Sequence, residues 1–383
     1  MKLTVAFLTT DSREHYRKHA EPRPFFGTAP AALLQGFEAI PDLIDVQVVS
    51  CLQKPVSPFV RLAPNICYHG LHVPPIGWLK TGYQGCIRAV RRWVREHRPD
   101  LVHGQGTERD CALSAVLSGA PNLITIHGNM RRLARVGRAR PFSFDWLAAR
   151  LEGWTVPRAG GVLCITRHAE QEVRGLARRT WIVPNAVDPG FLDGTPAPVR
   201  PKRVLCVANL APVKNQNGLI RALDRLAGEV AFELVFHGQW DPAQPHGREF
   251  GELLASRPWC RYAGFLDRAA LKEALRAATL LVLPSLEENC PMSILEAMAA
   301  GVPVAASRSG GIPDLVEDEV TGLLFDPAQP GTMDAAVRRL LADEALAGRL
   351  AAQARLRLRE RFLPEVVARR HVDVYRELLS TCS

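Results

Sequence analysis

The chain has 383 residues, of which 47% are hydrophobic and 23% are charged, a composition typical of globular proteins that excludes a largely disordered chain. This length exceeds what one hydrophobic core usually supports, so we expect two domains. The net charge of +9 favours an acidic partner, such as nucleic acid, a phosphorylated ligand or an anionic membrane, but an aromatic share of 7% argues against nucleic acid, where bases stack on aromatic rings.

The cellular location is expected to be the cytoplasm. No stretch is long and apolar enough to predict a membrane span, and the N-terminal residues turn charged too soon for a signal peptide, so they predict a buried strand. The nine cysteines are scattered without a C-x-x-C pair, which predicts neither a zinc site nor a disulfide framework. This usage fits a reducing compartment.

Short continuous apolar runs alternate with helical patterns along the whole chain, which predicts parallel strands covered on both faces and hence an α/β fold. The pattern restarts near residue 200. The predicted strands are residues 3–10, 45–51, 101–105, 123–128 and 161–166, and then 203–210, 232–238, 279–285, 302–307 and 322–326. Predicted helices include residues 219–230 and 269–278.

Residues 183–203 hold five prolines and two glycines with little periodicity, and are interpreted as an interdomain linker. We therefore expect a first doubly wound domain over residues 1–190 and a second over 191–360, with a cleft between them. Ligands of such sheets bind beyond the carboxyl ends of the strands.

One stretch after a predicted strand, "SLEENCPMSILEAMAAG" (285–301), combines two acids with a helix start. Pro291 is expected in the first turn of a helix that Gly301 closes. The amides of Met292 and Ser293 then form an anion site. A phosphate bound there would lie between Glu288 and Glu296, which could accept hydrogen bonds from hydroxyls on either side. That is the pattern of a nucleotide sugar; the alternative is a solvated Glu288 and a Glu296 that caps something locally.

Three further residues are candidates by position. Lys214 follows the first strand of the second domain, where it could neutralise a diphosphate, or it is a solvated lysine. His127 ends a strand of the first domain and could donate to a sugar hydroxyl, or it is a satisfied core histidine. Gly27 follows the first strand and could allow close backbone approach, although its surroundings lack the G-x-G-x-x-G pattern of dinucleotide oxidation.

The ordered set of motifs resembles retaining glycosyltransferases of family 4, which have the GT-B fold of two Rossmann-like domains. The E-x7-E signature matches "ENCPMSILE" (288–296), and "PDLVHGQG", "TIHG", "VPNAVD", "VANLAPVKN", "GFLDRAAL" and "GGIPDLVEDEVTGLLF" follow the family's order over nearly the whole chain. The resemblance implies that residues 361–383 form a C-terminal helix that crosses back to the first domain.

The resemblance also implies roles for the candidate residues. Glu296 would bind the ribose, Glu288 and His127 the transferred sugar, Lys214 the diphosphate, and Leu266 the base. Gly27 would lie near the donor phosphate and the acceptor. Further donor-binding positions are Asn289, Cys290, Pro291, Met292 and Ser293.

Two positions depart from the family's pattern. Asn209 stands where an arginine usually pairs with the diphosphate, so Lys214 or another arginine would carry more of that charge. The usual "EGFG" is "ENCP" here, which leaves the identity of the donor sugar open.

The resemblance implies a retaining, metal-independent transfer from a nucleotide-diphosphate sugar to a glycan, a lipid-linked or a small-molecule hydroxyl, without a cofactor. The arginine-rich run 131–140 would contact anionic membrane from the acceptor-side domain; the alternative for this run and for residues 87–98 is a solvated face. A nucleotide-sugar epimerase, a glycoside hydrolase with two carboxylates and a non-catalytic nucleotide-binding module remain alternatives.

Overall fold

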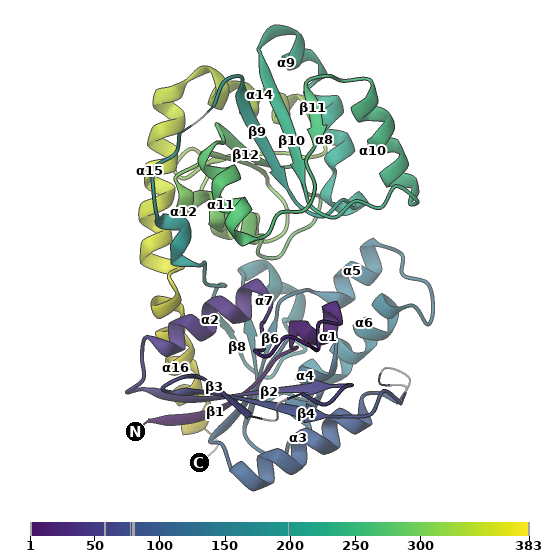
Figure 1. Ribbon diagram of the computed structural model, residues 1–383, viewed down its shortest axis with the longest axis vertical. Coiled ribbons are helices and arrows are strands. Elements are labelled where there is room, and N and C mark those ends of the chain that lie inside the picture. The colour runs from purple at the N-terminus through teal and green to yellow at the C-terminus, as the bar shows by residue number, and fades with distance from the viewer. Residues whose placement is uncertain (1, 57–58, 77, 79–80, 198, 382–383) are drawn as a thin grey trace. The chain divides into compact units, whose positions relative to one another are not determined.

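The computed structural model describes residues 2–56, 59–76, 78, 81–197 and 199–381 (Figure 1). The chain forms two compact units. Unit 1 comprises Met1–Ala186 and Leu363–Ser383, and unit 2 comprises Val187–Phe362. None of the helices in the described ranges is both long enough and apolar enough to cross a membrane.

Unit 1 is built on an eight-stranded sheet in the order β3-β4-β2-β1-β5-β6-β7-β8, in which only β3 and β4 pair antiparallel. Its strands are β1 (Leu3–Leu8), β2 (Ile44–Leu52), β3 (Phe59–Ala63), β4 (Ile66–His72), β5 (Leu101–Gln105), β6 (Asn122–Ile126), β7 (Gly161–Cys164) and β8 (Thr180–Ile182). Its helices are α1 (Ser12–Tyr16), α2 (Thr28–Glu38), α3 (Gln84–His97), α4 (Asp110–Val116), α5 (Met130–Val136), α6 (Phe144–Thr155), α7 (Arg167–Val173) and α16 (Pro364–Ser380), with the 3₁₀ turn η1 (Val156–Arg158) after α6.

Helices cover both faces of this sheet, which explains why its strands are continuous apolar runs. Along β1, Val5 and Phe7 enter one core with α2 and α16, while Ala6 and Leu8 enter a second core with α3, α4 and α7. The α2–α16 contact is close: a Cβ on Gly36 would come within 2.1 Å of the carbonyl oxygen of Pro364. Only glycine allows the two helices to approach this far.

Unit 2 is built on a six-stranded, fully parallel sheet in the order β11-β10-β9-β12-β13-β14. Its strands are β9 (Lys202–Val207), β10 (Phe232–His237), β11 (Cys260–Tyr262), β12 (Leu280–Leu283), β13 (Val304–Ser307) and β14 (Leu323–Phe325). Its helices are α8 (Gln216–Ala222), α9 (Asp224–Glu229), α10 (Pro245–Ala255), α11 (Arg268–Arg276), α12 (Met292–Ala300), α13 (Ile312–Leu315), α14 (Pro330–Ala342) and α15 (Glu344–Arg361), with 3₁₀ turns η2 (Pro189–Leu192) and η3 (Pro212–Lys214).

Each strand predicted from an apolar run is present, but β3, β4, β8 and β11 were not predicted. β3, β8 and β11 lie at sheet edges, and β4 is largely half-buried, so none of the four shows a long, continuously buried apolar run. The predicted helix 219–230 is wrong in its continuity, because α8 ends at Ala222 and α9 starts at Asp224 around the fully buried Leu223. The segment interpreted as a linker contains η2.

Candidate functional site

The expected donor-binding residues of unit 2 follow the carboxyl ends of its strands. From β9 the chain passes to β10 on one side, whereas β12 lies on the other side of β9. In doubly wound sheets, ligands usually bind beyond the carboxyl ends of the strands at such a reversal of strand order. Lys214 lies in the connection after β9 and Glu288 in the connection after β12, so the two residues flank this reversal.

Lys214 and Glu288 contact each other. Lys214 Nζ donates to Glu288 Oε1 at 2.5 Å, and the buried Ser285 Oγ donates to the same oxygen at 2.9 Å. Sequence reasoning assigned these two side chains separately, to the diphosphate and to the sugar. The structure adds that they form one ion pair, and that Ser285, which was not selected, orients the carboxylate.

The loop that carries Glu288 is held by the glycines that follow β13. Gly311 N donates to the Glu288 carbonyl at 2.9 Å, and Ser307 Oγ donates to the Ser285 carbonyl at 2.5 Å. Gly310 has φ of +54°, and a Cβ on it would come within 2.0 Å of the Glu288 carbonyl oxygen. The "RSGG" stretch therefore fixes the position of the acid.

Helix α12 starts directly after this loop. Pro291 is its N-cap rather than a residue of its first turn, which corrects the predicted position by one residue, and Pro291 itself makes no side-chain cap hydrogen bond. Pro291 is buried, while Met292 and Ser293 of the first turn are partly exposed, as are Asn289 and Cys290 before it. Gly301 closes the helix with φ of +74°, as predicted. The amides of this first turn thus face a region that solvent or a ligand can reach.

Glu296 lies one turn into α12 and is 7% exposed. Burial raises the pKa of this carboxyl to about 7; the Arg268 charge opposes the shift and the Asp188 charge adds to it. Arg268 Nη1 also donates to Asp188 Oδ2 at 3.1 Å, and Lys272 Nζ lies 3.6 Å from the same oxygen. Asp188, Arg268 and Lys272 therefore join the candidate site around Glu296, and the sequence analysis did not select them.

Asn209 and Leu266 lie in two other loops at this edge of the sheet. Asn209 is exposed, and its Oδ1 accepts a hydrogen bond from the amide of Gln239 at 2.9 Å, so it ties the loop after β9 to the loop after β10. Leu266 is half-buried in the turn between β11 and α11. Its neighbour Phe265 is 65% exposed and was not selected, although an exposed ring is the better surface for stacking a base.

In unit 1, His127 belongs to a chain of polar side chains rather than standing alone. Its Nε2 lies 2.8 Å from Gln105 Oε1, and Gln105 Nε2 lies 3.0 Å from His103 Nε2. His103 Nδ1 in turn lies 2.7 Å from the hydroxyl of Tyr375 on α16. Burial lowers the pKa of His127 to about 4, a shift that a hydrogen bond with Asn185 opposes. His127 is therefore neutral at physiological pH, and its ring can donate one hydrogen bond and accept another.

A small cavity of about 10 Å³ lies beside this chain, lined by His127, Gln105, Asn185 and His371 among others. This is the space of roughly one water molecule. His127, which is expected to contact a sugar hydroxyl, thus has polar side chains beside it, and the sequence did not reveal them.

Gly27 is the exposed N-cap of α2. Its φ is −57°, and a Cβ at this position would meet only Pro30 Cδ, at 3.9 Å. Neither the backbone nor the neighbouring side chains of the described chain require glycine here. A requirement for glycine would have to come from a bound molecule.

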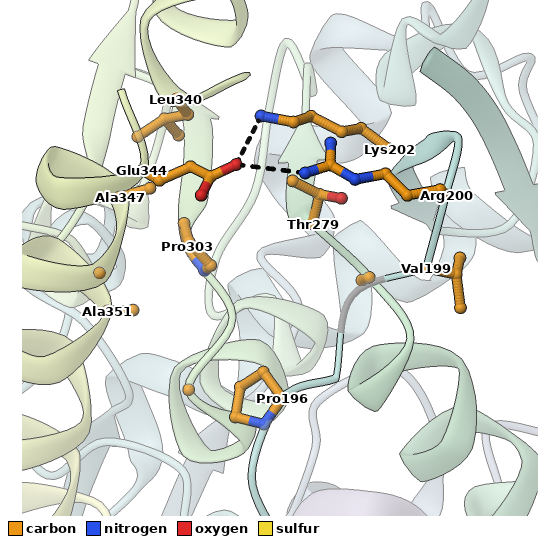
Figure 2. Close-up of a pocket in the computed structure, with 13 residues that line it drawn as sticks. Pro196, Val199, Arg200, Lys202, Thr279, Pro303, Leu340, Glu344, Ala347 and Ala351 are labelled. Atoms are coloured by element: carbon orange, nitrogen blue, oxygen red, sulfur yellow. Dashed lines mark hydrogen bonds and ion pairs between the residues drawn. The ribbon is translucent and has the colours of Figure 1, made fainter. Parts of the chain in front are cut away.

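A larger cavity of about 410 Å³ lies at the amino-terminal ends of the unit 2 strands, away from the loops that hold the candidate donor site (Figure 2). Its walls include Pro303 and Thr279, which immediately precede β13 and β12, and the small residues Ala347 and Ala351 of α15. Figure 2 shows Glu344 facing Lys202 and Arg200 at one end, at 3.0 and 3.6 Å. None of the described residues that line it was expected to bind the donor.

No disulfide joins any two cysteines in the described ranges. The fold brings Cys51, Cys86 and Asp110, which are far apart in sequence, within 4.8 Å of one another in the buried core of unit 1. The pKa of the Cys51 thiol is raised, first by its hydrogen bond with Cys86 and then by burial. Cys51 is therefore a neutral thiol that packs as a small apolar side chain.

Two protein families match the chain. The family described as "Glycosyl transferases group 1" matches residues 192–357, and the family described as "Glycosyltransferase Family 4" matches residues 35–191. Among curated proteins, the chain is 27% identical to the 2-deoxystreptamine glucosyltransferase of Streptomyces kanamyceticus, over 83% of this chain and 86% of that protein. It is 29% identical to the glycogen synthase of Mycobacterium tuberculosis, over 73% of this chain and 69% of that protein.

Solved structures share the fold. Sucrose-phosphate synthase from Thermosynechococcus elongatus superposes with a TM-score of 0.78 and 21% identity, over 99% of this chain and all of that one. Anabaena HepE in complex with UDP-glucose superposes with a TM-score of 0.70 and 19% identity, over 99% of this chain and all of that one. These matches confirm the expected GT-B class, two α/β domains with parallel-sheet cores.

Proposed function

Because the chain belongs to the glycosyltransferases of group 1 and family 4, we propose that it moves a sugar from a nucleotide-diphosphate sugar to a hydroxyl acceptor, with retention of configuration and without a metal. The observation that carries this proposal is the Lys214–Glu288 ion pair at the reversal of strand order in unit 2, next to the start of α12. Structures of the similar protein HepE with UDP and with UDP-glucose support a nucleotide sugar as the donor.

The donor diphosphate would bind at the amides of Met292 and Ser293. An ammonium group has three N–H donors, so Lys214 can hold a phosphate oxygen while it still contacts Glu288. Cationic and amide donors placed where negative charge develops are usually the largest contribution to catalysis. Lys214 would therefore stabilise the diphosphate as it leaves.

The nucleoside would lie on the far side of the phosphates. Glu296 would accept hydrogen bonds from the ribose hydroxyls, and the charge of Arg268, which Asp188 orients, would attract the Glu296 carboxylate. The base would lie against Leu266 or the exposed ring of Phe265. Asn209 cannot supply the positive charge of an arginine, so Lys214 would neutralise most of the negative charge of the diphosphate.

The chemical step would not need a nucleophile from the protein. The bond between the anomeric carbon and the diphosphate oxygen breaks, and the electron pair stays on that oxygen. The acceptor oxygen attacks the same face, and its proton passes to the departing phosphate, so the configuration is retained. Glu288 and the neutral His127 would orient the sugar hydroxyls.

We propose a glycan, a lipid-linked or a small-molecule hydroxyl as acceptor, and a cytoplasmic location with peripheral contact to anionic membrane. Gly27 supports a nearby ligand, because the chain itself does not require glycine there. The family makes an epimerase or a non-catalytic module the less favoured alternatives.

The test is incubation of the protein with radiolabelled UDP-, GDP- and ADP-sugars, with and without lipid or glycan extract. Transfer of label only when acceptor is present, abolished in Lys214→Met, supports the proposal. Label converted to a new nucleotide sugar without acceptor would show an epimerase. Binding of nucleotide without any turnover would show a non-catalytic module.

A further inference from the structure

The hairpin formed by α5, α6 and their connection (residues 130–158, the α5–α6 hairpin) has an unusual charge. It contains seven arginines and two acids. One acid, Glu152, is buried and accepts hydrogen bonds from Thr107 and from the amides of Met130 and Arg131. Asp145 is the other, so the exposed charge of this hairpin is strongly positive.

The same hairpin exposes apolar side chains. Phe142 is 81% exposed, Val136 54% and Phe144 43%. Phe142 also has φ of +64°, a conformation in which bulky residues are disfavoured. The centroid of its ring lies 5.3 Å from that of Trp146. The fold therefore gains little from an aromatic side chain at residue 142.

Tryptophan and arginine alternate along one face of α6 and η1. Trp146, Arg150, Trp154 and Arg158 are spaced four residues apart, which places them on one helical face. The Arg150 guanidinium lies 4.7 Å from the Trp146 ring, and that of Arg158 lies 4.4 Å from the Trp154 ring. Such amphipathic rings with flanking cations favour the boundary between lipid headgroups and acyl chains.

The other arginine-rich run provides the contrast. On α3, the apolar residues Ile87, Val90 and Val94 are buried in the core, and the exposed side chains are the arginines and other polar groups such as Glu96. That run is an ordinary solvated face. The α5–α6 hairpin differs because exposed apolar groups accompany its arginines. Its two helices pack side by side (Figure 1).

We propose that the α5–α6 hairpin is a docking surface for anionic membrane, with Phe142 entering the acyl boundary and the arginines contacting lipid phosphates. This rests on the proposed function in one respect, since it specifies the membrane contact suggested there. A soluble polyanion would use the arginines but would gain nothing from burying Phe142, so the aromatic tip distinguishes the two partners.

The test is co-sedimentation of the full chain with vesicles of phosphatidylcholine, with or without about one third phosphatidylglycerol. We expect binding to the anionic vesicles. Phe142→Asn should weaken it about tenfold, because one exposed phenyl group is lost. Asparagine tolerates a positive φ, so this variant should fold at least as well as the parent. Arg135→Gln with Arg140→Gln should weaken it roughly 25-fold.

The matched control is Arg91→Gln with Arg95→Gln, which removes equal charge from α3 and should change binding by less than about twofold. No binding of the parent to anionic vesicles would overturn the proposal. So would an equal loss in the control, or parent-like binding by Phe142→Asn, the result expected for a polyanion site.

Calorimetric titration with UDP, GDP and ADP in the absence of vesicles separates this proposal from the proposed function. The nucleotide affinity should be unchanged in all three variants, since none alters the donor site. Vesicle binding without nucleotide binding would leave the docking surface standing and remove the donor site. Nucleotide binding without vesicle binding would do the reverse.

Discussion

Glu296 should be a residue that lowers stability in exchange for function. The folded state raises the pKa of this carboxyl from 4.5 to about 7, chiefly by burial. Ionising it in the folded protein therefore costs about 3 kcal/mol above pH 7. Below pH 4.5 the carboxyl is protonated in both the folded and the unfolded state, and this cost is absent. As pH rises from 4.5 to 7, the unfolded state ionises while the folded state stays protonated, so the free energy of unfolding falls.

Glu296→Gln removes this cost and keeps the side-chain size. Arg268 is not left unpaired, because it still donates to Asp188. We expect the variant to be more stable than the parent by about 3 kcal/mol at pH 8 and by about 1.4 kcal/mol at pH 5.5. The same variant should bind the donor at least about tenfold more weakly, because a charged acceptor for the ribose hydroxyls is lost.

The assay is urea-induced unfolding at both pH values, monitored through amide hydrogen exchange of peptides from unit 2. A readout specific to unit 2 is needed because the two units need not unfold together. Glu273→Gln, on the exposed surface of α11, is the control and should change stability by less than about 0.5 kcal/mol. If the stability difference between Glu296→Gln and the parent were zero, or equal at both pH values, the argument from a buried ionised carboxylate would be refuted.

Three other substitutions test the site. Lys214→Met should lower kcat at least about a hundredfold, because the charge beside the leaving diphosphate is lost, and near-normal steady-state kinetics would contradict this role. Gly27→Ala should leave the melting temperature unchanged, since the new methyl group meets only Pro30, but should lower kcat/KM; an unchanged kcat/KM would show that no ligand approaches the backbone there. Gly310→Ala should destabilise unit 2 by at least about 2 kcal/mol, because its Cβ would overlap the Glu288 carbonyl and its φ is positive, and a parent-like thermal unfolding curve would speak against this packing.

The sequence revealed the parts of the fold that one strong local signal encodes. Continuous apolar runs located the central strands such as β1 and β12, because these are buried on both faces. Strands β4 and β11 escaped notice, because a short or partly exposed strand is stabilised by its neighbours rather than by its own composition.

The site was predictable as a set of residues but not as a set of contacts. Lys214 and Glu288 were both selected from their positions after apolar runs, yet their ion pair depends on β9 and β12 being neighbours in the sheet, which sequence order does not reveal. Asp188 was missed because it lies among prolines and was assigned to a linker. Arg268 directly follows the motif residues of "GFLD", so the motif could have drawn attention to it.

The division of the chain into units has a consequence for biosynthesis. Unit 2 is one uninterrupted stretch, whereas unit 1 needs α16 from beyond residue 362 to cover α2 and one face of its sheet. During translation, all residues of unit 2 are therefore synthesised before α16 is. Until α16 is made, unit 1 has an apolar face that its earlier residues leave uncovered. The earliest-synthesised unit is the last to be completed, and its open face is where a chaperone would bind the nascent chain.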